Sequence, residues 1–121
     1  MRRQKMGVTL QAAIETYHEA EPHQREHWWT EVSEVCFGKD YELSGKLEEV
    51  GAQEGWPTID IDDDGTDATR DPGDAYGFQW MTGDQFVAAV KLCEEPSELA
   101  RGVVAMLGCF SRPTRLLFWR E

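Results

Sequence analysis

The sequence predicts an α+β fold, and three observations lead to this prediction. Several segments place apolar residues at helical spacing behind good N-cap residues, two others alternate apolar and polar residues as strands do, and an apolar run near the C-terminus suits an interior strand. Together they predict a small antiparallel sheet of about three strands with four or five helices packed on it. The length of 121 residues is typical of one domain, so residues 1–121 are expected to form a single domain.

The N-terminal third is predicted to be helical. A first helix follows Thr9, a good N-cap residue, and ends before Pro22. Its apolar residues recur at helical spacing: Leu10, Ala13, Ile14 and Tyr17. A second helix is expected over residues 22–38, with an apolar stripe that consists of Trp28, Val32, Val35 and Cys36. Residues 41–54 fit either a strand or a helix, and a helix after Ser44 is the preferred interpretation.

The middle of the chain predicts a hairpin. Residues 58–62 and 76–81 alternate apolar and polar side chains, which is typical of strands, and the second of them places Tyr76, Phe78 and Trp80 on one face. Residues 63–75 between them are rich in Asp, Gly, Thr and Pro, which favours a long exposed loop.

The C-terminal part is predicted to contain two helices and a strand. Thr82 and Gln85 resemble a capping box and open a helix whose inward residues are Phe86, Ala89, Val90 and Cys93. Ser97 is the N-cap of a second helix, whose inward residues are Leu99, Val103, Met106 and Phe110. Residues 116–119 are apolar on both faces and predict an interior strand.

The net charge of −11 is concentrated in one segment. Residues 40–74 carry twelve acidic and two basic side chains, whereas the flanking thirds are close to neutral. Such a segment repels nucleic-acid phosphates and anionic lipid, and it attracts basic proteins or divalent cations. We therefore expect no direct nucleic-acid binding and no membrane association.

The cysteines and the N-terminus indicate a cytoplasmic protein. Cys36, Cys93 and Cys109 are odd in number and lack CxxC spacing, and their apolar neighbours suit buried thiols in a reducing compartment. Residues 6–11 supply no apolar run of the length that an export segment needs, and no run is long enough for a membrane span.

Residues 59–71, IDIDDDGTDATRD, contain the pattern DxDxDG. This resembles the front half of an EF-hand calcium loop, in which alternate oxygen ligands converge because a glycine lets the backbone turn. The predicted ligands would be Asp60, Asp62, Asp64, Thr66 and Asp71. The back half departs from that family, since Asp71 stands where a bidentate Glu is usual and Pro72 with Gly73 blocks a following helix. The competing interpretation is a solvated acidic hairpin loop.

His23, Glu26 and His27 form the pattern HxxEH, which resembles the zinc motif of the inverted zincin peptidases. On a helix, a spacing of four places both imidazoles on one face, where they could share a zinc ion with Glu26 as a base. The competing interpretation is an exposed helix start, because the third ligand has to come from elsewhere in the chain.

The preferred functional hypothesis is a non-enzymatic acidic binding protein, an inhibitor of the immunity or anti-defence type. It would dock its acidic surface, as a nucleic-acid mimic, on a basic partner that binds or cleaves nucleic acid. The segment supplies its charge from Asp60, Asp62, Asp63, Asp64, Asp67, Asp71 and Asp74. Flanking charge comes from Glu48, Glu49 and Glu54, and Trp56 and Tyr76 are the aromatic anchors.

Three alternatives accompany this hypothesis. The chain could be a calcium-binding module that uses the DxDxDG loop, or a small zinc-dependent hydrolase that uses HxxEH. In a third reading, Arg112, Arg115 and Arg120 form a counter-patch that folds against the acidic loop. The motifs GxSxG, GxxxxGK[ST] and GxGxxG are missing from the sequence, so we expect no enzyme of those classes and no cofactor other than the calcium of the first alternative.

Overall fold

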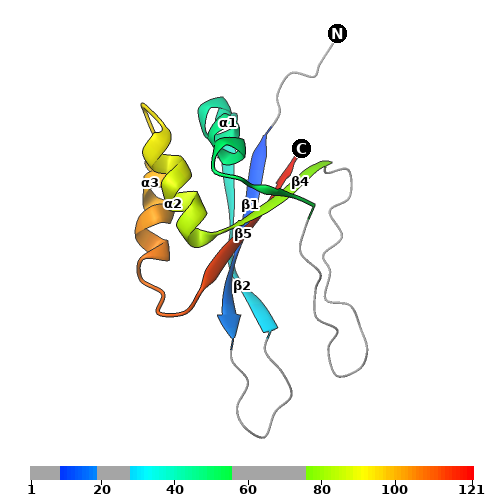
Figure 1. The fold of residues 1–121 in the computed structure, drawn as a ribbon, viewed down its shortest axis with the longest axis vertical. Coiled ribbons are helices and arrows are strands. Elements are labelled where there is room, and N and C mark those ends of the chain that lie inside the picture. Colours follow the sequence, from blue (N-terminus) through cyan, green and yellow to red (C-terminus); the bar gives the residue numbers. More distant parts are fainter. Residues whose placement is uncertain (1–8, 19–27, 56–75) are drawn as a thin grey trace, which may run out of the picture.

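A five-stranded antiparallel sheet forms one of the two layers of the fold (Figure 1). The computed structural model describes residues 9–18, 28–55 and 76–121. The strands are β1 Leu10–His18, β2 Trp28–Gly38, β3 Gln53–Glu54, β4 Tyr76–Thr82 and β5 Thr114–Arg120. Their order in the sheet is β2-β1-β5-β4-β3, so the last strand of the chain lies in the middle and β2 and β3 are the two edges.

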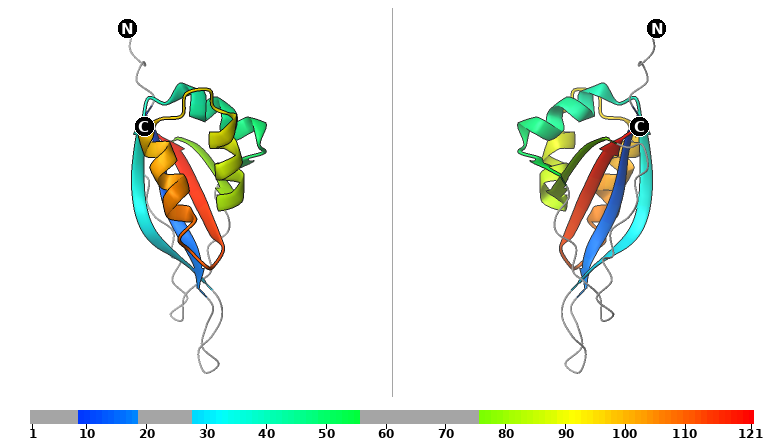
Figure 2. Two further views of the ribbon diagram at one scale, coloured as in Figure 1. Left: turned by 90° about the vertical axis from the view of Figure 1, so that its left-hand side faces the viewer. Right: turned by 90° about the vertical axis from the view of Figure 1, so that its right-hand side faces the viewer.

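Three helices cover one face of this sheet (Figure 2). They are α1 Tyr41–Glu49, α2 Gly83–Leu92 and α3 Glu98–Leu107. Each begins at a side chain that accepts a hydrogen bond from an otherwise unpaired amide of the first turn, and the three caps are Asp40, Thr82 and Ser97. At α2 the capping box is complete, since Gln85 N donates to Thr82 Oγ1 at 3.1 Å and Thr82 N donates to Gln85 Oε1 at 3.0 Å.

The main core lies between the helices and the sheet. Its centre is Phe86 of α2, whose ring centroid is 5.8 Å from that of Phe37 and 6.1 Å from that of Phe118. Leu43 and Leu47 of α1 are fully buried beside it. The strands add Leu10, Ala12, Ile14, Met81 and Leu116 to this core.

The predicted sheet of three strands with four or five helices is wrong, although α+β describes the fold. The predicted helices over residues 10–17 and 22–38 are contradicted where the structure describes them, because β1 and β2 occupy those positions. In β1 both faces are buried, with Ala12 and Ile14 against the helices and Ala13 on the opposite face. The apolar spacing therefore fitted a helix as well as a strand.

The other expectations have mixed outcomes. The strand over residues 76–81, the interior strand over 116–119 and the helices after Thr82 and Ser97 are confirmed. The helix expected after Ser44 begins earlier, at Tyr41, and ends before the short strand β3. Leu99 was expected to face inward and is 44% exposed, whereas Ala100, Val103 and Leu107 are the buried residues of α3. The strand expected at 58–62 and the loop at 63–75 lie outside the described residues.

A buried ion pair lies on the sheet face opposite the helices. Arg115 Nε of β5 donates to Glu15 Oε1 of β1 at 2.7 Å, and both side chains are almost fully buried. The Arg115 guanidinium lies 4.2 Å from the ring centroid of Trp29, and this ring packs edge-on against Tyr17. Next to them, Ala13, Leu117 and Trp119 form a second, smaller core, against which Phe78 and Trp80 pack.

Removing one member of the Glu15–Arg115 pair is expected to destabilise the protein strongly. Arg115→Met leaves a carboxylate buried without its cation, which costs about 3–5 kcal/mol of unfolding free energy. Adding Glu15→Leu to Arg115→Met should recover most of this loss, because apolar pairs of similar volume often replace buried ion pairs at little cost. Urea denaturation of the wild type, the single variant and the double variant measures both effects. As the control, Glu49→Gln breaks an exposed ion pair and should change stability little; an equally small effect of Arg115→Met would contradict the buried role.

Candidate functional site

Four of the residues predicted to bind a partner lie in the described part of the chain: Glu48, Glu49, Glu54 and Tyr76. The seven aspartates from Asp60 to Asp74 and Trp56 lie outside it, and so do all five predicted calcium ligands. The predicted zinc residues His23, Glu26 and His27 also lie outside it. The calcium and zinc alternatives therefore stay predictions.

Three of the residues predicted to bind a partner, Glu48, Glu49 and Glu54, lie close together along the chain, at the end of α1 and in the edge strand β3. The end of α1 is joined to β3 by a short turn, in which Ala52 N donates to Leu47 O at 3.0 Å. Gln85 Nε2 of α2 donates to Val50 O at 3.2 Å and so fixes this turn to the neighbouring helix. The turn thereby brings Glu48 and Glu49 of α1 to the same side of the fold as Glu54 of β3. We call Glu48, Glu49, Glu54 and Tyr76 the acidic edge.

The pairing of β3 with β4 sets where residues 56–75 are attached. Glu54 lies opposite Gln79 in the register of the two strands, and Gly55 N donates to Phe78 O at 2.7 Å. Gly55, which follows β3, and Tyr76, which begins β4, therefore lie at neighbouring strands of this edge. The sequence between them contains seven aspartates and one arginine.

Arg120 lies at the acidic edge and is held by the backbone. Its Nη1 donates to Gly77 O at 2.6 Å, and Gly77 has a φ of +66°. A Cβ at position 77 would lie 2.7 Å from Arg120 Cδ, so both the backbone angle and the close approach require glycine here. Burial lowers the pKa of Arg120, and the nearby Glu48 and Tyr76 oppose this shift electrostatically.

The predicted counter-patch of three arginines is contradicted for Arg115, and the acidic loop that it was expected to contact lies outside the described residues. Arg115 is buried on the opposite face with Glu15, and Arg120 donates to a backbone carbonyl. Arg112 is exposed in the turn before β5.

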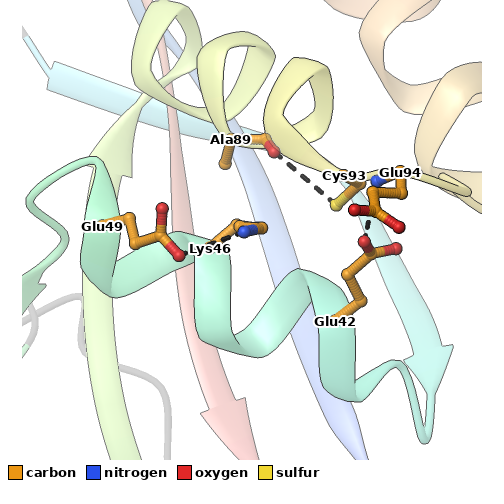
Figure 3. A network of polar contacts seen from close by, with 6 residues as sticks. All are labelled: Glu42, Lys46, Glu49, Ala89, Cys93 and Glu94. Atoms are coloured by element: carbon orange, nitrogen blue, oxygen red, sulfur yellow. Dashed lines mark hydrogen bonds and ion pairs between the residues drawn. The ribbon is translucent and has the colours of Figure 1, made fainter.

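The carboxylates of α1 differ in whether they already form hydrogen bonds or ion pairs within the fold (Figure 3). Glu42 accepts hydrogen bonds from the amides of Glu94, at 2.7 Å, and Glu95, at 3.3 Å, and so holds the turn before α3. Glu49 forms an exposed ion pair with Lys46 at 3.1 Å, and this hydrogen bond raises the pKa of Lys46. Within the described part of the chain, Glu48 and Glu54 are exposed and form no ion pair.

A second surface lies at the opposite edge of the sheet, between β2 and α3. An open groove with a volume of about 440 Å³ runs between them, which is within the usual size of ligand-binding sites. It is lined by Ser33, Glu34, Val35, Cys36, Leu99, Gly102, Val103 and Met106. We call it the β2–α3 groove. The sequence analysis missed it because it assigned β2 to a helix.

The prediction that all three cysteines are buried is wrong for two of them. Cys36 and Cys109 are exposed, and Cys93 is buried at the end of α2, where its thiol donates to Ala89 O (Figure 3). Burial raises the pKa of Cys93, and the carboxylates of Glu42 and Asp40 raise it further. Cys36 is exposed on the edge strand β2, where it lines the β2–α3 groove, whereas its two neighbours Val35 and Phe37 pack on the core.

Two further classes of site were sought among the described residues. In residues 9–18, 28–55 and 76–121, no three His, Cys, Asp or Glu side chains are grouped closely enough to hold a metal ion. None of the helices described there has the length and apolar character that crossing a bilayer requires. In comparisons with known proteins, no family model, no curated protein and no solved structure matches this chain.

At mildly alkaline pH, iodoacetamide is expected to alkylate Cys36 and Cys109 of the folded protein well before Cys93. The thiolate is the reactive form, and the raised pKa of Cys93 leaves it less ionised than an ordinary thiol at any pH near or below that pKa. Peptide mass spectrometry of samples quenched at successive times gives the three rates. In urea the three rates should converge; comparable rates in the folded protein would contradict the buried position of Cys93.

Proposed function

We propose that this chain is a non-enzymatic acidic binding protein of the inhibitor kind, which docks its acidic edge on a basic partner that binds or cleaves nucleic acid. The observation that carries this proposal is the position of Glu48 and Glu54. Both are exposed without an ion pair in the described part of the chain, and Glu54 lies in β3, shortly before the aspartate-rich sequence.

The physical argument is electrostatic. Carboxylates fixed on a rigid scaffold produce a local negative potential that attracts a basic surface and speeds its encounter with the correct face. The α1 helix, the β3–β4 pairing and the Val50–Gln85 hydrogen bond provide that scaffold. A surface of this sign competes with nucleic acid for a basic groove, because both present negative charge.

Internal neutralisation is the main argument against such a surface, and it differs among the carboxylates. Arg115 pairs with Glu15 on the other side of the sheet. Arg120 keeps its charge while it donates to Gly77 O, and it interacts electrostatically with Glu48, whereas Lys46 pairs with Glu49. We therefore assign Glu54 the largest share of the interaction.

Neutralising the acidic edge is expected to slow association with the partner. The partner is first isolated by capture from lysate of the native host at low and at high salt, and it is then purified. Glu48→Gln, Glu49→Gln and Glu54→Gln are combined in one variant, and its association rate constant should fall by about tenfold at low salt, with a flatter salt dependence. Stopped-flow fluorescence or surface plasmon resonance measures both quantities.

The matched control combines Glu94→Gln, Glu95→Gln and Glu98→Gln at the start of α3, which changes the net charge by the same amount. This control should retain most of the association rate, because Glu94 and Glu95 lie beside Glu42 at the start of α1, whereas Glu48 and Glu49 lie at its end. Equal slowing in both variants would show that only the net charge matters. Unchanged kinetics in the acidic-edge variant would overturn the proposal.

A further inference from the structure

The edge strand β2 contains a short regular run between two irregularities. At one end of the run, Leu10 pairs with Gly38 and the next residue of β1 pairs with Cys36, so Phe37 has no partner in β1. At the other end, Ile14 pairs with Ser33 and the next residue of β1 pairs with Glu31, so Val32 has none. Extra residues of this kind are β-bulges, which twist an edge strand and limit how far another strand can pair with it. The regular run between them is residues 33–36.

The same four residues line the β2–α3 groove. On the other wall, α3 presents Leu99, Gly102, Val103 and Met106, which recur at the spacing of one helix face. Leu99 is 44% exposed, and Val32 beside the regular run is 41% exposed. Among the described residues, no strand pairs with the outer edge of β2. A short stretch of strand edge therefore adjoins an apolar groove.

The charge around the groove indicates what can occupy it. The two elements that form the groove, β2 over residues 28–38 and α3 over residues 98–107, carry three acidic side chains and one basic side chain. A second copy of the chain would bring the same charge and a net −11 of its own, so pairing between two β2 strands is opposed by repulsion. An extended segment with both apolar and basic side chains complements this surface, because its apolar side chains fit the groove and its basic side chains are attracted by the carboxylates.

We propose that β2 and the β2–α3 groove bind a short extended segment of a partner, which adds to the sheet as a sixth strand. Its main chain pairs with residues 33–36, its apolar side chains enter the groove against Leu99 and Met106, and its basic side chains face the surrounding carboxylates. The bulges at Val32 and Phe37 limit the added strand to a few residues. This surface lies at the sheet edge opposite the acidic edge, so the inference stands independently of the function proposed above.

The test uses a synthetic octapeptide of alternating valine and arginine. Binding is followed by fluorescence anisotropy of the labelled peptide and by the alkylation rate of Cys36. At a peptide concentration about ten times its Kd, Cys36 should react about tenfold more slowly, because only the unoccupied fraction remains accessible. Cys109 is exposed outside the groove and should keep its rate, which makes it the internal control.

Two peptide controls separate strand addition from simple charge attraction. The same peptide with its central amides N-methylated keeps charge and side chains but cannot donate along the strand, and its binding should be lost. A valine–glutamate peptide should not bind either. Equal binding of the methylated peptide, or bound peptide without protection of Cys36, would overturn the proposal. If the protein dimerises with rising concentration and Cys36 is protected without peptide, the segment that binds β2 belongs to a second copy of the chain, and the proposed partner is wrong.

A groove-filling variant completes the test. Gly102→Leu places a side chain in the groove, and a Cβ at this position meets no atom within 4 Å, so the helix accommodates it. Gly45→Leu is the matched control, since Gly45 lies in α1 and is equally unobstructed. Both variants should melt at or above the temperature of the wild type, because leucine favours helix more than glycine does. Only Gly102→Leu should weaken peptide binding. Equal binding by both variants would contradict the proposal that the peptide occupies the groove.

Discussion

The position of β5 in the middle of the sheet is the constraint on which the rest of the structure depends. Residues 115–119 are all buried, so both faces of this strand have to be covered. The helices cover one face, and the small aromatic core with the Glu15–Arg115 pair covers the other. Because β1 pairs with one side of β5 and β4 with the other, the two ends of the chain must meet before the sheet is complete.

The same arrangement separates the two candidate surfaces. β2 is attached through β1, and β3 through β4, so the β2–α3 groove and the acidic edge lie at opposite edges. A change at one edge reaches the other only through β5 and its two neighbours. The buried ion pair adds to this separation, because it fixes Arg115 on the helix-free face and away from the acidic edge. We therefore expect the two surfaces to act independently.

The sequence predicted the C-terminal half of the fold better than the N-terminal half, for a physical reason. Thr82 and Ser97 are local signals, since a cap is made with residues of the same helix turn. β1 carries no comparable signal, because Ala12, Ala13 and Ile14 are buried on both faces by partners far along the chain. Composition also led to the proposed role of Glu48 and Glu54 at the acidic edge, which stays a prediction. The groove could not be predicted, because it exists only once β2 is an edge strand beside α3.

The two edges also differ in the kind of interaction that each can support. β3 has only two residues and little backbone to offer, so recognition there depends on side-chain charge, which sets the rate of encounter and weakens as salt rises. β2 offers backbone and apolar contacts over a short run, and such contacts chiefly determine how slowly a complex dissociates. A partner that engaged both edges would combine fast, salt-sensitive association with slow, salt-insensitive release. Under the strand-addition proposal, the bulges of β2 and the carboxylates near it have one consequence in common, because both oppose pairing between two copies of the chain and leave the regular run for a basic strand.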